Sequence, residues 1–153
     1  MTGVQTCALP ICWSRNNPVD CAGGETRDTI PEVLELIAMH PDVDAVIYLG
    51  IGIQSNQARM MREGRFYPDH GLERIVAYHE RQDERFAEAA HELSVASGKP
   101  ILVATELAIA DPGNAGPATV KRTGRLCYGS GEQAVRALGH LVRYASYRRA
   151  RHA

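Results

Sequence analysis

The sequence has few aromatic residues, no closely spaced cysteine pair and no long apolar run. Aromatic residues make up 6% of the 153 positions, so a core must be built mainly from Ala, Val, Leu and Ile. The four cysteines form no C-x-x-C pair, which argues against a zinc knuckle or a disulfide framework and favours a reducing, cytoplasmic setting. The longest apolar run, residues 45–53, contains two glycines and is far shorter than the roughly 20 residues of a membrane span.

Charge of neither sign dominates. The formal net charge is −1, with 23% charged and 44% hydrophobic residues. Nucleic-acid-binding domains are usually strongly basic, so we expect neither a nucleic-acid nor a membrane partner. The length and the hydrophobic content fit one globular domain with a core of its own.

The first residues differ from the rest. Residues 1–11 read MTGVQTCALPI, with no amphipathic period and without the basic start of a signal peptide. This string resembles the translation of a common sequencing adapter; a flexible natural N-terminus is the alternative. We therefore expect a non-native or disordered leader over residues 1–12, a domain over 13–147 and a basic tail over 148–153.

Short apolar strands alternate with amphipathic helices along the domain. The β-branched runs at 43–49 and 101–105 predict strands that are buried on both faces. Further elements expected from apolar spacing and from turn residues are strands at 18–22 and 126–128 and helices at 30–39, 57–62, 72–97, 118–123 and from 131 onward. This alternation predicts an α/β fold, a flavodoxin-like three-layer sandwich with a parallel sheet.

Two helices carry more detailed expectations. In the helix at 72–97, the charged stretch 80–85 predicts a solvated face. In the last helix, Ser130 is a suitable N-cap and the residues beyond 148 are expected to fray. The stripe predicted to face inward there consists of Val135, Leu138, Val142 and Ala145.

In such sheets, ligands bind beyond the carboxyl ends of the strands. Three segments are expected there: 20–25, 50–56 and 106–116. The second is the most suggestive, because glycines allow close backbone approach and a helix start offers unpaired N–H groups to a phosphate. Its candidate phosphate-facing residues are Gly50, Ile51, Gly52, Gln54, Ser55 and Asn56. An ordinary strand–helix turn is the alternative, since the third glycine of a dinucleotide fingerprint is missing.

Other polar residues give weaker signals. Asp20 and Glu25 could form an acid/base or metal pair, but the neighbouring Gly23 and Gly24 favour a capping and turn role. The six histidines have no nucleophile at an informative spacing, and His70, in a polar loop, is the least determined of them. No catalytic residue and no metal ligand is assigned.

Two separated motifs resemble the ADP-forming acetate–CoA ligase family, which consists of NDP-forming acyl-CoA synthetases related to succinyl-CoA synthetase. The segment Asn17-Pro18-Val19-Asp20, followed by Gly23-Gly24, is similar to the NPVD…G opening of one of its domains. The run at 124–138, with Ser130 and Glu132, is similar to that domain's closing G-x-P-V-Y-x-S-P-E-R-A-V-R-A-L motif. Segments 41–46 and 97–103 match in kind and order, so the resemblance covers about 16–147.

The sequence also departs from that family. Leu126 and Gly131 stand where the closing motif has prolines, and the loop over residues 59–71 is longer than expected. Leu126 lies at the start of the fourth expected strand, and Gly131 lies at the start of the last helix.

The resemblance implies a fragment of an enzyme that makes acyl-CoA, ADP and phosphate from an acid, CoA and ATP through a phosphohistidine. It implies as partners a CoA-binding domain, a phosphohistidine-loop domain and an ATP-grasp module, in the same chain or in another subunit. CoA, ATP or ADP and Mg²⁺ would belong to that full enzyme, and none is expected to be bound by this domain alone. No histidine here matches the family's histidine loop, so the isolated chain is expected to be inactive.

The resemblance also has a consequence for the fold. In the family a central first strand precedes the NPVD motif, and here its place is taken by the adapter-like segment. We therefore expect a gap between the segments of Val19 and Val46, and a chain that is marginally stable or prone to aggregate on its own. The alternative function is a stand-alone flavodoxin-like binding or regulatory module.

Overall fold

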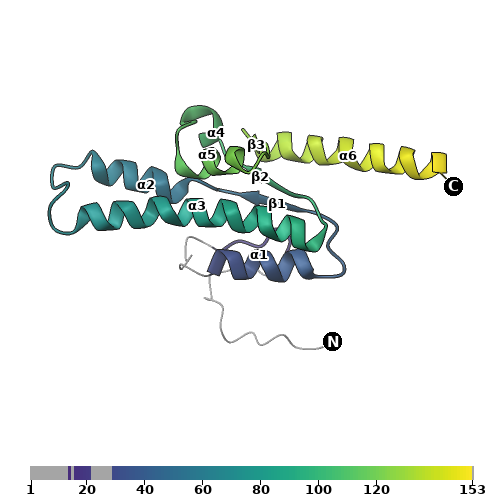
Figure 1. The fold of residues 1–153 in the computed structure, drawn as a ribbon, viewed down its shortest axis with the longest axis horizontal. Helices are drawn as coiled ribbons and strands as arrows, with labels where there is room; N and C mark the ends of the chain where they lie inside the picture. The colour runs from purple at the N-terminus through teal and green to yellow at the C-terminus, as the bar shows by residue number, and fades with distance from the viewer. Residues whose placement is uncertain (1–13, 15, 22–28, 153) are drawn as a thin grey trace.

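The computed structural model describes Ser14, residues 16–21 and residues 29–152. Helices and strands alternate along this part of the chain (Figure 1). The elements are α1 (Thr29–Met39), β1 (Val46–Leu49), α2 (Ile53–Arg62), α3 (Leu72–Ser97), β2 (Ile101–Ala104), α4 (Leu107–Ala110), α5 (Ala115–Arg122), β3 (Cys127–Tyr128) and α6 (Gly131–His152). The expected leader, residues 1–12, lies outside the described residues, as do Gly23, Gly24 and Glu25.

The strands form a parallel sheet in the order β1-β2-β3. Val46 is paired with Ile101, and Val103 with Cys127. The sheet confirms the predicted α/β class and its parallel strands. Parallel neighbours need a crossover connection, which the helices between the strands supply.

Each face of the sheet packs on a different set of helices. Val46, Ile101 and Val103 belong to the cluster that includes buried side chains of α1, α3 and α5. Leu102 and Ala104 point the other way and pack with the α6 residue Ala134. Figure 1 shows α1 and α3 on one side of the sheet and α6 on the other. Three layers result, consistent with a flavodoxin-like sandwich.

Among the described strands, β1 lies at an edge of the sheet, and a cavity lies beside it. The amides of Val46 and Gly50 donate to carbonyls at the β2 side, so the peptide groups of Ile47 and Leu49 point away from β2. The cavity, of about 730 Å³, is lined by residues of β1, α1 and 16–21. Val19 and Val46 both line it, and the gap expected between their segments stays a prediction.

The strand predicted over 18–22 is wrong for the described residues. Ser14 and Asp20 form one isolated antiparallel bridge, and the segment does not join the parallel sheet. Asp20 N and Ser14 N each donate to the other's carbonyl, so this segment satisfies its peptide groups locally.

Two helices begin earlier than predicted, and a third was missed. α2 begins at Ile53 instead of 57, because Gly52 ends the turn in a left-handed conformation with φ 94°. α5 begins at Ala115 instead of 118, because the Asn114 side chain caps it by accepting from Gly116 N at 3.1 Å. The short helix α4 lies in the segment 106–116, for which the sequence predicts no helix before residue 118.

The long helix α3 has the predicted bounds, and Gly98 ends it with φ 66°. The prediction that residues 80–85 form a solvated face is wrong at Gln82 and Asp83, which are buried. α3 lies between α2 and α5, so side chains on more than one of its faces are covered.

The inward stripe predicted for α6 is also wrong in part. Ala134, Ala137 and Leu138 pack toward the sheet, whereas Val135 and Val142 are more than half exposed. Small alanines let the helix lie close to the strands. The helix also continues to His152 through the segment expected to fray, and its end extends away from the sheet (Figure 1).

Candidate functional site

The turn of residues 50–56 lies at the carboxyl end of edge strand β1 and leads into α2. Gly50 and Gly52 have φ values of 90° and 94°, a backbone region that favours glycine. This is the place at which an open parallel sheet presents ligand-binding loops. The position is the one that the sequence predicts for the turn.

Asp83 of α3 binds two backbone amides of this turn, a contact that the sequence did not predict. Its Oδ1 accepts from Gly52 N at 3.0 Å, and its Oδ2 accepts from Ser55 N at 2.6 Å. The carboxylate therefore caps α2 in place of a side chain from the N-cap residue, which is a glycine. Its side chain is nearly inaccessible, with a relative exposure of 1%.

This contact corrects the expectation of unpaired amides at the start of α2. The amides of Gly52 and Ser55 already have an anionic acceptor, and its charge lies at the positive end of the helix dipole. A phosphate brought to the same amides would have to displace a carboxylate. The start of α2 is therefore already occupied by an anion, the Asp83 carboxylate.

Burial raises the pKa of the Asp83 carboxyl above its usual value. The hydrogen bonds from Ser55 and Gly52 and the nearby His79 act in the opposite direction, since each favours the charged form. Desolvation is the largest of these effects. The raised pKa reflects the free energy required to bury the carboxylate charge beside two neutral amides.

Asn114 and Gly116 brace the turn from the other side. Asn114 Nδ2 donates to the Gly52 carbonyl at 3.0 Å, while its Oδ1 accepts from Gly116 N. A Cβ at Gly116 would lie 2.7 Å from Gly52 N, so the two backbones meet directly. α3 and the start of α5 thus hold Gly52 at both its N–H and its carbonyl, and the turn is rigid.

The residues of the turn divide by where they face. Gly50 and Gln54 line the cavity beside β1, as does Ile53, which is exposed. Gln54 Oε1 lies 2.5 Å from His79 Nδ1. The predicted phosphate-facing residues that are buried are Ile51, Gly52 and Ser55. Asn56 accepts from Arg59 on its own helix, so of the predicted set only Gly50 and Gln54 face the cavity.

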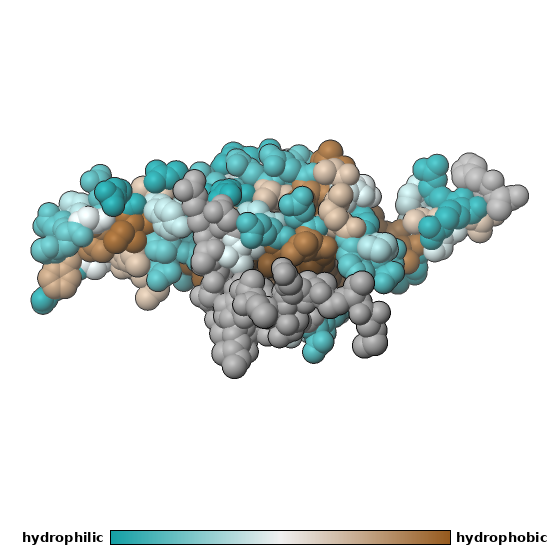
Figure 2. Space-filling view, turned by 90° about the horizontal axis from the view of Figure 1, so that it is seen from below, coloured by the Kyte–Doolittle hydropathy of each residue, from teal (hydrophilic) through white to brown (hydrophobic). Residues whose placement is uncertain are grey.

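The cavity is chiefly apolar. Its wall is formed mainly by aliphatic side chains of α1 and β1, with His40, Asp20 and Asp83 among the polar residues. No lysine or arginine belongs to its described lining. Figure 2, which views the molecule from the α1 side, shows a hydrophobic area in brown that borders the grey residues.

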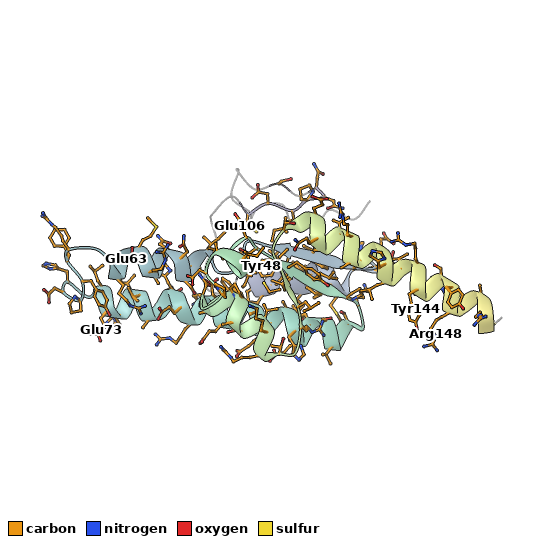
Figure 3. All side chains as sticks on the ribbon, turned by 90° about the horizontal axis from the view of Figure 1, so that it is seen from above. Tyr48, Glu63, Glu73, Glu106, Tyr144 and Arg148 are labelled. Carbon is orange, nitrogen blue, oxygen red and sulfur yellow. The ribbon has the colours of Figure 1, made fainter. Side chains whose placement is uncertain are left out.

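Exposed apolar side chains also lie at the carboxyl end of the sheet. Leu49, Ile53 and Ile109 are each more than half exposed. Glu106, which Figure 3 labels, is the N-cap residue of α4 and follows the end of β2. This end of the sheet therefore combines a rigid turn with an uncovered apolar surface.

The residues that carry the family resemblance have local roles. Ser130 Oγ accepts from Gln133 N at 3.2 Å, which confirms the predicted N-cap. Glu132 pairs with Arg136 at 2.8 Å on an exposed surface. Asn17, Pro18 and Asp20 line the cavity. Gly23 and Gly24 lie outside the described residues, as does Glu25, so the proposed Asp20–Glu25 pair is not described.

The histidines and cysteines of the described residues form no reactive cluster. His40 lies at the end of α1, where Lys99 Nζ donates to its carbonyl at 2.7 Å. His91 accepts from Arg125 Nε at 2.9 Å, Cys127 is a free thiol, and Cys21 is partly buried. Within the described ranges, no group of three or more His, Cys, Asp or Glu side chains could hold a metal ion.

No described helix is long and apolar enough to cross a membrane. Comparison with family models, with curated proteins and with solved structures finds no match for this chain.

Proposed function

We propose that this chain is a domain of a nucleotide-dependent acyl-CoA ligase, and that it lends the carboxyl end of its sheet to a site completed by neighbouring modules. The enzyme would convert an acid, CoA and ATP into acyl-CoA, ADP and phosphate through a phosphohistidine carried elsewhere. The observation that carries the proposal is the braced turn at Gly50–Asn56, which ends edge strand β1 beside an apolar cavity.

The open side of β1 supports a role inside a larger assembly. The peptide groups of Ile47 and Leu49 face away from β2, and aliphatic side chains line the cavity beside them. A strand edge that pairs with no other described strand and lies next to an apolar wall favours the addition of further polypeptide. The exposed Leu49, Ile53 and Ile109 extend this surface to the carboxyl end of the sheet.

The chemistry of the cavity argues against CoA or ATP as its own ligand. Both carry several phosphates, which proteins usually meet with Arg, Lys or free helix-start amides. The described lining holds no Arg or Lys, and Asp83 occupies two amides of the α2 start. The described residues also offer no acidic cluster for Mg²⁺. We assign these groups to the other modules.

The turn would then act by holding neutral groups in a fixed position at the cavity. Gly50 and Gln54 reach the cavity as neutral groups, and Asp83 with Asn114 keeps them in place. A loop bearing a phosphohistidine could approach Gly50 closely because glycine has no side chain, and could accept a hydrogen bond from the Gln54 amide. The chain thereby contributes an orienting, phosphate-facing half-site and no catalytic histidine.

The first test is long-read sequencing of the locus upstream of Trp13. We expect a continuous frame that encodes a CoA-binding domain and a phosphohistidine loop. A stop codon or an unrelated frame at that place would contradict the proposal. Formation of a CoA thioester by the isolated chain would contradict it as well, because the chain would then hold the whole active site.

The second test uses the full-length enzyme. Gln54→Ala should slow the formation of phosphohistidine from radiolabelled ATP by about tenfold, since an orienting contact is lost. Asn56→Ala is the matched control, because Asn56 bonds to Arg59 and does not line the cavity. Equal rates for the two variants would remove the turn from the mechanism.

The alternative, a stand-alone binding or regulatory module, makes a different prediction. A stably folded monomer of this chain would bind a phosphate ligand or a flavin. Titration calorimetry with inorganic phosphate and with flavin mononucleotide separates the two functions. Saturable binding by the monomer supports the module and counts against the ligase domain.

A further inference from the structure

The end of α6 extends away from the rest of the molecule, and it is strongly basic. Residues 133–152 contain five arginines and neither Asp nor Glu. Every described residue from His140 to Arg151 is exposed. Figure 3 shows Tyr144 and Arg148 on the part of α6 that lies clear of the other elements. We call residues 141–151 the α6 arm.

One face of this arm is apolar. The spacing of Leu141, Val142 and Ala145 puts them on the same side of the helix, in line with Leu138 and Ala134, which pack on the sheet. Leu141 and Val142 are 52% and 55% exposed. The apolar stripe thus continues beyond the sheet that covers its first part. Arg148 and Arg149 end it on the same face.

The outer face of α1 carries negative charge and, like the α6 arm, exposes apolar side chains. Residues 29–44 contain two Glu and two Asp, and neither Lys nor Arg. Glu32, Glu35, Leu36 and Met39 lie on one exposed side of the helix. Leu36 and Met39 are 73% and 57% exposed. The α1 face therefore offers apolar contacts flanked by carboxylates.

The two surfaces match each other in length as well. α1 has 11 residues, and the arm has the same number, so each spans about 16 Å. Within one molecule they cannot meet, because α1 and α6 lie on opposite sides of the sheet (Figure 1). Pairing of two α6 arms with each other is unfavourable, since it would bring arginines together without a carboxylate.

We propose that the α6 arm of one copy packs on the α1 face of a second copy, with Leu141 and Val142 against Leu36 and Met39. Arg148 and Arg149 then lie opposite Glu32 and Glu35. Reciprocal exchange of the two arms makes a closed two-fold dimer with two identical contacts. The inference rests on α1 and α6 alone and does not depend on the proposed function.

The test is the mass of the full chain in solution, measured by analytical ultracentrifugation. We expect a dimer at low ionic strength that dissociates as salt is added, because exposed charge pairs are screened. Arg148→Glu with Arg149→Glu should raise the dimer Kd by at least about tenfold, since like charges then face each other. Glu32→Arg with Glu35→Arg should do the same.

Mixing the two double variants is the decisive experiment. In the mixture, each acidic arm meets a basic α1 face and each basic arm meets an acidic one, so a heterodimer should form. Arg143→Glu with Arg151→Glu is the matched control, because it makes the same charge change away from the stripe and should leave the dimer intact. Circular dichroism of each variant checks that the helices are retained.

Several outcomes would overturn the proposal. One is a monomer at every concentration and salt. Another is an oligomer or aggregate whose mass is unchanged by the charge reversals. A third is a control pair that weakens the dimer as much as the charge-reversed pairs do. Binding of the monomer to anionic phospholipid vesicles through Arg148 and Arg149, without dimer formation, would assign the arm to a membrane surface instead.

Discussion

The carboxylate of Asp83 accepts a hydrogen bond from the amide of Gly52, 31 residues earlier in the chain, at a distance of 3.0 Å. The same carboxylate accepts from Ser55 N, so one side chain of α3 fixes the whole β1–α2 turn. The position of the candidate site is therefore set by a helix that is remote in sequence, and its geometry depends on one buried charge.

Removal of this acceptor should destabilise the fold. Asp83→Ala leaves two buried amides without a partner and should lower the free energy of unfolding by about 2–4 kcal/mol, whereas Asp83→Asn keeps one acceptor and should lose less. Urea denaturation followed by circular dichroism measures both. Glu84→Gln is the control, because Glu84 pairs with Arg122 at an exposed position. Equal losses at 83 and 84 would show that the buried contact is not special.

The stability contributed by Asp83 should also depend on pH. Burial raises the pKa of this carboxyl in the folded protein above the unfolded value of about 3.9. The folded state then holds the proton more tightly, so its stabilisation is complete below pH about 3.9 and is lost as pH rises through the folded pKa. The measurement is the difference in unfolding free energy between wild type and Asp83→Asn over that window. A difference that grows with pH would reverse the sign and contradict the pKa direction.

Much of the fold could be predicted because its signals are local. The runs that became β1 and β2 are short and β-branched, and α3 ends at Gly98 as its sequence indicates. Asp83 could not be predicted, since it stands in a charged stretch that looks solvated. Its burial follows from the packing of α3 against α2 and α5, for which the periodicity of one helix holds no information.

The error in α6 has a similar origin. The predicted stripe was chosen from large apolar residues, including Val135 and Val142. Val135 lies off the packed face, whereas Val142 lies on that face but beyond the sheet, so both are exposed. The helix approaches the sheet through Ala134 and Ala137, whose small size signals closeness only once the sheet is known. The choice of turn residues facing the cavity also needed the structure, because the neighbours Gln54 and Ser55 could be separated only by their position around α2.

The contact between Gly116 and Gly52 predicts a sharp difference between Gly116, in the first turn of α5, and Gly113, in the segment before it. Gly116→Ala would place a Cβ 2.7 Å from Gly52 N and 2.9 Å from Gly52 Cα, so a backbone must move. We expect a loss of about 2 kcal/mol or more in unfolding free energy. Gly113→Ala is the matched control, since its nearest neighbour would be an Asp111 oxygen at 3.8 Å. If both variants melt at the same temperature, the backbone contact does not constrain the turn.

The open edge of β1 predicts how the isolated chain behaves. No other described strand pairs with this edge, and such an edge beside apolar side chains templates pairing between molecules, so the chain alone should aggregate on warming. Leu49→Lys puts a charge at this edge, where the side chain is 58% exposed, and should raise the onset temperature of light scattering without loss of helix signal. Val95→Lys makes the same change at an exposed site on α3 and should have a smaller effect, because α3 has no free strand edge. If both lysines suppress scattering equally, aggregation follows general surface hydrophobicity, and the β1 edge is not its template.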